Sequence, residues 1–198
     1  MEEKEIFLAK KEMRKRFRAL RRALPATERM TASSRMTAEL SRQYFYQDSN
    51  VIMAYASMLE EVQLYDLLRF SLDIGKRVCI PFLRKDGVME AAELTGLDEL
   101  VESDLGVLTV RDAETRVVDP AGLGCIVVPG VAFSKEGARL GMGKGFYDRF
   151  LKERSPYAYR VALAFDCQLT EEIPMEPHDV YMDSIITESG TFYCKREV

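Results

Sequence analysis

The segment best suited to chemistry is a glycine-rich stretch at residues 139–148, which reads Arg-Leu-Gly-Met-Gly-Lys-Gly-Phe-Tyr-Asp. Glycine has no side chain in the way and adopts positive φ, so backbone N–H groups here can approach a ligand closely. Such N–H groups at the start of a helix form a concave anion site, to which Lys144 adds a positive charge. Asp148 follows where a magnesium ion held against phosphates would need an oxygen ligand. The stretch therefore predicts a nucleotide-phosphate site.

Neither common phosphate-binding template fits this stretch. The P-loop pattern requires Ser or Thr after its lysine, where this chain has Gly145. The dinucleotide-binding pattern requires a third glycine or an alanine, where this chain has Phe146. The sequence thus indicates phosphate binding of another kind.

Two basic residues near the N-terminus are a second candidate for phosphate binding. Residues 3–24 have helical periodicity, and at about 100° per residue Lys10 projects within about 20° of Phe17, on the apolar side. Arg14 lies one turn further on. A lysine that points into a protein needs an anion, or must extend its amine to solvent. Lys10 is therefore either an edge lysine or, with Arg14, a ligand of the phosphates that Lys144 binds. The other basic residues of this helix are expected to face solvent: Lys11, Lys15, Arg18 and Arg22.

Two acids follow the apolar, strand-like run at residues 51–56, and ligands of open α/β sheets bind at such strand ends. Glu60 is interpreted as an acid that stabilises a helix start, and Glu61 as a substrate contact. Their position predicts one wall of a pocket.

A polar cluster precedes the apolar run at residues 184–187. Asp179 or Asp183 could join Asp148 at a magnesium ion, or could cap a turn instead. His178 is the single histidine of the chain and is interpreted as a loop residue. The number of carboxylates on the metal stays open.

The elements that position these residues alternate between strand and helix patterns, which favours a parallel sheet. We expect an α/β fold, a three-layer α/β/α domain with a mostly parallel, Rossmann-like open sheet. Residues 86–122 carry many turn signals, and no element is predicted there. The expected helices are residues 3–24, 27–46, 64–75 and 146–152, and the expected strands are residues 51–56, 77–81, 125–128, 159–165, 184–187 and 191–194.

The bulk properties predict one cytoplasmic domain over residues 1–198. A monomer is expected, although the sequence does not fix the oligomeric state. A net charge of −4 argues against a general nucleic-acid binder, and no apolar run reaches the roughly 18 residues that span a membrane. The four cysteines are widely spaced and are expected to be reduced thiols: Cys79, Cys125, Cys167 and Cys194.

Taken together, these residues resemble the 5-formyltetrahydrofolate cyclo-ligase family, also called methenyltetrahydrofolate synthetase. The resemblance covers almost the whole chain, and the stretch at 139–148 is its most specific part. The segments that carry it are Lys10 with Arg14, residues 57–62, residues 75–81, the Val-Pro-Gly loop at 128–130, residues 139–148 and Asp179.

The resemblance implies a ligase that uses ATP and Mg²⁺ to close 5-formyltetrahydrofolate, a small-molecule substrate, into 5,10-methenyltetrahydrofolate with release of ADP and phosphate. It implies catalytic roles for Lys10, Arg14 and Lys144, and a metal site at Asp148 and Asp179. ATP would contact Lys10, Arg14, Arg139, Leu140, Gly141, Met142, Gly143, Lys144, Gly145, Phe146 and Tyr147. The folate would contact Ala56, Glu61, Met142, Gly143, Lys144, Gly145 and Phe146.

Other functions stay open on the sequence alone. A folate- or nucleotide-binding protein of the same fold could keep the pocket and lack turnover, although the presence of both Lys144 and Asp148 favours an enzyme. A sugar-phosphate isomerase would need an acid–base pair near the glycine-rich stretch, and none is evident. Nucleic-acid binding is the weakest alternative, because Lys10 and Arg14 point inward.

Overall fold

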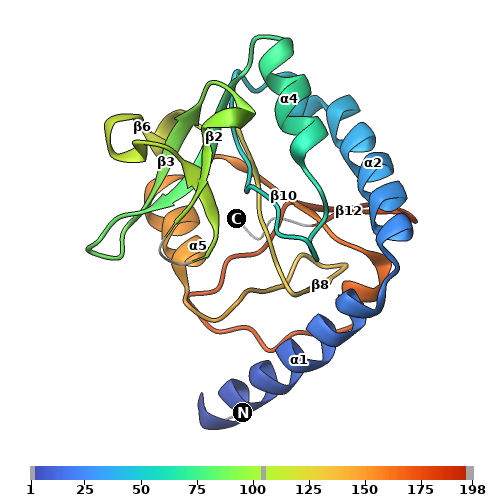
Figure 1. The fold of residues 1–198 in the computed structure, drawn as a ribbon. Coiled ribbons are helices and arrows are strands. Elements are labelled where there is room, and N and C mark those ends of the chain that lie inside the picture. Colours follow the sequence, from blue (N-terminus) through green and yellow to red (C-terminus); the bar gives the residue numbers. More distant parts are fainter. Residues whose placement is uncertain (1–2, 104–105, 195–198) are drawn as a thin grey trace.

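The computed structural model describes residues 3–103 and 106–194, and its centre is an eight-stranded mixed sheet (Figure 1). The strand order is β13-β12-β10-β7-β1-β2-β3-β6. Neighbours from β12 to β2 pair in parallel, and the pairs at the two ends of the sheet are antiparallel. The bounds are β1 (Val51–Met53), β2 (Arg77–Leu83), β3 (Met89–Leu94), β6 (Val117–Val118), β7 (Cys125–Val127), β10 (Tyr159–Leu163), β12 (Ser184–Thr187) and β13 (Gly190–Tyr193).

Both faces of this sheet are covered, because successive residues of its buried strands point to opposite sides. Ile52 of β1 packs in one cluster with residues of α2 (Ala26–Arg42) and α4 (Tyr65–Asp73). Met53 packs in a second cluster with Phe150 and Leu151, which lie in the π-helical turn (Phe150–Arg154) that continues α5 (Phe146–Arg149). The expected α/β/α layering with a mostly parallel sheet is confirmed.

The first helix packs on a separate, smaller sheet. Strands β11 (Leu169–Thr170), β8 (Ala132–Ser134) and β9 (Arg139–Leu140) form this sheet in that order. Phe17 of α1 (Glu3–Ala23) is buried against Ala132 and Leu140. Figure 1 shows α1 along the lower edge of the molecule, beneath β8. Because β9 is the first part of residues 139–148, this packing brings the inward side of α1 next to the glycine-rich stretch.

Several expected bounds differ from the structure. The helix expected over residues 27–46 is broken at Gln43, whose backbone is extended, and α3 (Tyr44–Gln47) follows as a separate turn. The strand expected over residues 51–56 ends at Met53. Residues 86–122, without a predicted element, contain β3, β6 and a hairpin of β4 (Leu100–Glu102) and β5 (Leu108–Val110).

No helix in the described part of the chain is both long and apolar enough to cross a membrane.

Candidate active site

Arg14 joins the first helix to the glycine-rich stretch. Its Nε donates to the carbonyl oxygen of Gly141 at 2.8 Å. A Cβ atom on Gly143 would lie 3.2 Å from Cζ of Arg14, and Gly143 has φ of +96°. Glycine is therefore favoured at position 143 both by the backbone conformation and by the packed guanidinium. The first helix and the glycine-rich stretch, two separate candidate regions in the sequence, are therefore in direct contact.

Arg139 anchors the far end of the stretch. Its side chain is buried, and its Nη2 donates to Oδ1 of Asp148 at 2.7 Å while its Nη1 donates to the Pro129 carbonyl at 3.1 Å. The guanidinium also lies over the ring of Tyr147, 5.9 Å from its centroid. Among the described residues, Nε of Arg139 and Oη of Tyr147 are buried without a hydrogen-bond partner. Unpartnered buried polar atoms of this kind are what a bound ligand would satisfy.

Lys10 is buried and holds two carboxylates. Its Nζ lies 2.7 Å from Oε2 of Glu176 and 2.5 Å from Oδ2 of Asp179. The hydrogen bond from Lys10 lowers the pKa of Glu176, whereas burial opposes that shift. Lys10 is thus not an edge lysine, and the anions that it meets here are carboxylates of the chain. Glu176 was missed in the sequence, because only the folded turn brings it to the first helix.

One predicted metal ligand, Asp179, lies in the turn that contains Glu176, and the other, Asp148, contacts the residue that follows this turn. Oδ1 of Asp148 accepts the N–H of Val180 at 3.2 Å, next to Asp179. Ligand atoms of Glu176, His178 and Asp179 lie within 4.8 Å of one another. Oxygen donors of this kind suit Mg²⁺. In the structure Asp148 is paired with Arg139 and Asp179 with Lys10, so a cation would compete with two ion pairs.

The sequence also indicated two other polar residues of this segment, Asp183 and His178. Asp183, the alternative metal ligand, accepts the backbone N–H of Arg160 at 2.7 Å and stays with the sheet. His178 lies in a turn with its side chain exposed, as expected for a loop residue.

Glu61 forms a second part of the site, in the loop that follows β1. Its Oε2 accepts the N–H of Met58 at 3.0 Å, and its Oε1 lies 4.0 Å from Nη1 of Arg21. Burial raises the pKa of Glu61, and both the Met58 hydrogen bond and the Arg21 charge act against that rise. Ala56, the other predicted folate contact in this loop, is buried.

Glu60 does not stabilise a helix start, so that interpretation was wrong. Helix α4 begins only at Tyr65, because the intervening residues form a turn and an irregular segment. Oε1 of Glu60 instead accepts from Nε of Arg22 at 2.6 Å, and its Oε2 lies 3.6 Å from Nη2 of Arg21. Glu60 therefore ties the loop to α1.

The charge of Glu61 reaches the glycine-rich stretch. Burial is the main cause of the raised pKa of Tyr147, and the negative charge of Glu61 raises it further. Tyr55 has a raised pKa for the same two reasons. The charge of Glu61 thus acts on both phenols, so Glu61, Tyr55 and Tyr147 belong to one region.

Part of the stretch borders a pocket of about 470 Å³. Its lining includes Gly143, Lys144, Gly145, Asp148 and His178. Met142 and Lys144 are exposed, whereas the side chain of Leu140 packs against Phe17 and leaves only its backbone for a ligand. A larger groove of about 880 Å³ lies between α2 and the β12–β13 hairpin, and no predicted site residue lines it.

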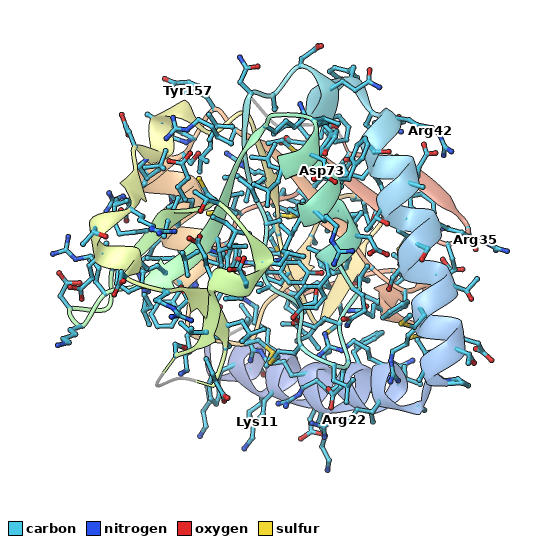
Figure 2. The ribbon with its side chains drawn as sticks, turned by 45° about the horizontal axis from the view of Figure 1, so that its top comes forward. Lys11, Arg22, Arg35, Arg42, Asp73 and Tyr157 are labelled. Carbon is cyan, nitrogen blue, oxygen red and sulfur yellow. The ribbon has the colours of Figure 1, made fainter. Side chains whose placement is uncertain are left out.

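More basic residues of α1 are covered by the rest of the chain than the sequence predicted. Lys11, Lys15 and Arg22 are exposed as expected, and Figure 2 shows Lys11 and Arg22 directed away from the body of the molecule. Arg18, expected in solvent, is half-buried and its Nε is covered. Arg21 is buried, with 3% of its side chain exposed. Arg21 meets Glu60 and Glu61 of the loop that follows β1, and periodicity within the helix cannot show these partners.

Comparison with known proteins identifies similar chains. The sequence profile of the 5-formyltetrahydrofolate cyclo-ligase family matches residues 7–188. The 5-formyltetrahydrofolate cyclo-ligase of Mus musculus is 30% identical over 192 residues, which cover 92% of this chain and 95% of that protein. The enzyme of the same name from Mycolicibacterium smegmatis is 34% identical over 151 residues, 69% of this chain and 72% of that protein. The NMR structure of Aquifex aeolicus 5,10-methenyltetrahydrofolate synthetase superimposes with a TM-score of 0.84 at 28% identity and covers 96% of this chain and 94% of that one.

Proposed function

Because the chain belongs to the 5-formyltetrahydrofolate cyclo-ligase family, a family of ligases, we propose that it converts 5-formyltetrahydrofolate to 5,10-methenyltetrahydrofolate in an ATP- and Mg²⁺-dependent reaction that releases ADP and phosphate. One observation carries the proposal. Arg14 packs against Gly141 and Gly143, so a cation from the distant first helix lies beside a backbone suited to phosphate, which also carries the exposed Lys144.

The ATP site in this proposal consists of α1 and the glycine-rich stretch. Lys144 and Arg14 neutralise the phosphates, and the backbone from Gly141 to Gly145 approaches them closely. Lys10 binds the same phosphates by exchanging one of its carboxylate partners for a phosphate oxygen. Arg139 and Tyr147 each have a buried polar atom ready for a ligand. The remaining proposed ATP contacts are Leu140, Met142 and Phe146.

Asp148 and Asp179 are the proposed magnesium ligands. Their oxygens suit the ion, and Asp148 accepts the N–H of Val180, the residue next to Asp179. A bound Mg²⁺ would supply positive charge to the transferring phosphoryl group. Within the chain, Arg139 and Lys10 hold these carboxylates in place before the ion binds.

The folate would lie between Glu61 and the stretch. An ionised Glu61 can accept hydrogen bonds from the amino group and the adjacent ring N–H of the pterin, and Ala56 with residues 142–146 would complete the contacts. ATP supplies a phosphoryl group that turns the formyl oxygen into a leaving group, after which the N10 nitrogen closes the ring and phosphate departs. The protein contributes positioning and charge neutralisation, so no nucleophilic side chain is required.

The protein is further proposed to act as a cytoplasmic monomer. The four cysteines are free, which suits a reducing compartment.

The experiment that tests this function mixes the protein with 5-formyltetrahydrofolate, ATP and Mg²⁺ and follows the near-ultraviolet absorbance of the methenyl product. We expect product with all three components and none when ATP or the metal is omitted. Binding of folate or ATP without product would instead support a binding protein of the same fold.

A further inference from the structure

Arg21 is a buried cation at the opposite end of the inward face of α1 from Lys10. Its guanidinium lies between two carboxylates, with Nη2 3.6 Å from Oε2 of Glu60 and Nη1 4.0 Å from Oε1 of Glu61. Only 3% of the side chain is exposed, so solvent screens its charge weakly. The charge of Arg21 therefore acts mainly on these two acids.

Glu60 has a better partner than Arg21. Nε of Arg22 donates to its Oε1 at 2.6 Å, and this pair lies near the surface, with 57% of the Arg22 side chain exposed. Glu61 has no such alternative, because Arg21 is the one cation within 4.0 Å of it in the described part of the chain. Its other polar partner is the Met58 N–H.

The remaining surroundings of Glu61 oppose its ionisation. Glu60 adds a second negative charge, and burial is the main cause of the raised pKa. The charge of Glu61 raises the pKa of three neighbouring phenols, those of Tyr55, Tyr65 and Tyr147. These phenols supply no positive charge that would favour the carboxylate. Two groups favour the carboxylate: the Met58 N–H, which has the larger effect, and Arg21, which is the group that supplies a positive charge.

We propose that Arg21 is a positioning residue for substrate binding, which keeps the carboxylate of Glu61 ionised and oriented for the pterin ring. A distance of 4.0 Å is too long for a hydrogen bond, so Arg21 acts on Glu61 through charge. The proposal rests on the proposed function to the extent that Glu61 contacts the folate. An ionised Glu61 offers only acceptors to the pterin N–H groups, whereas a protonated one would place a donor against them.

A direct test measures the ionisation of Glu61 without any ligand. The side-chain carboxyl carbons of ¹³C-labelled glutamates are titrated by NMR, and Glu61→Gln identifies the Glu61 signal. In Arg21→Met the titration midpoint of Glu61 should rise by about one pH unit, since an opposite charge at this range shifts a pKa by that order. Arg21→Lys, which keeps the charge, should hold the midpoint near the wild-type value. Arg22→Met, the matched control on the same helix, should leave it unchanged.

An unchanged Glu61 midpoint in Arg21→Met would overturn the proposal. If that variant does not fold, Arg21→Gln replaces it, and failure of both neutral variants to fold would show a structural role instead. Binding of 5-formyltetrahydrofolate, followed by calorimetry across pH, adds a second readout. As the pH is lowered, the affinity for 5-formyltetrahydrofolate should begin to fall at a higher pH in Arg21→Met than in wild type. The affinity for ATP should be unaffected. A wild-type protein that binds no folate would contradict the proposed function, whereas the NMR titration would still decide the role of Arg21.

Discussion

The Nε of Arg14 donates to the carbonyl oxygen of Gly141 at 2.8 Å across a sequence separation of 127 residues. This bond places a helix that packs on the small sheet directly against a loop at the edge of the molecule. It also orients the guanidinium over Gly143, where a side chain would intrude. The phosphate site of the proposed mechanism depends on this one contact more than on any other.

Replacing Gly143 tests that contact. Gly143→Ala should raise the KM for ATP at least tenfold, because the new Cβ would press on Arg14 at a distance of 3.2 Å. The positive φ should also lower the free energy of unfolding by about 1 kcal/mol. Gly87→Ala is the matched control, since Gly87 has φ of +83° and open space around its Cβ position. It should lower stability similarly and leave KM unchanged; equal kinetic effects in both variants would argue against a role for the Arg14 contact.

Lys144 is exposed, so its role can be separated from stability. Lys144→Ala should lower kcat/KM by about two to three orders of magnitude, the usual loss when a group that stabilises transition-state charge is removed. Circular dichroism and the melting temperature should be unchanged. Lys152→Ala is the control, because Lys152 lines the same pocket but its Nζ contacts the Pro177 carbonyl. A normal rate in Lys144→Ala would remove this residue from the mechanism.

Lys10 pairs with two carboxylates in the structure and is also proposed to bind the phosphates of ATP. Lys10→Met leaves Glu176 and Asp179 without their cation, and loss of one member of a buried pair should lower the free energy of unfolding by up to about 3 kcal/mol. The KM for ATP should rise in the fraction that stays folded. Lys11→Met, on the exposed side of the helix, should change neither quantity. Reduced stability with an unchanged KM for ATP would assign Lys10 a structural role alone.

Glu61 and Glu60 offer a neighbouring pair with different expected roles. Glu61→Gln should raise the KM for 5-formyltetrahydrofolate about tenfold, the effect of weakening charge-assisted hydrogen bonds, and leave the KM for ATP unchanged. Glu60→Gln should alter both constants less than about twofold, since Glu60 is committed to Arg22. Steady-state kinetics with each substrate varied in turn measures both KM values in the two variants. Equal effects of the two substitutions would contradict a specific folate contact.

Local sequence pattern predicts part of the geometry of the candidate site. The inward direction of Lys10 follows from helical periodicity, and the alternation of glycines at 141–145 indicates close backbone approach to a ligand. The core strands of the sheet could also be predicted from the sequence, because buried parallel strands such as β7 are short continuous apolar runs. In each case the signal lies within one element.

What the sequence did not show depends on contacts between elements. Glu176 becomes a partner of Lys10 only when the turn at 176–179 packs against α1. Arg21 is paired with acids of a loop that follows a different strand, and periodicity within α1 does not show these partners. Arg18 lies on the side where periodicity predicts solvent, yet it is half-buried in the folded chain. The strands between residues 86 and 122 are short and closely spaced by turns, and their pairing rather than their composition defines them.

The central claim is that the formyl oxygen receives a phosphoryl group before the ring closes. The most direct measurement uses 5-formyltetrahydrofolate labelled with ¹⁸O in the formyl group, together with ATP and Mg²⁺, and analyses the released phosphate by mass spectrometry. We predict one ¹⁸O atom in phosphate for each methenyl product and each ADP formed. Unlabelled phosphate, or methenyl product formed at the same rate without ATP, would contradict the mechanism.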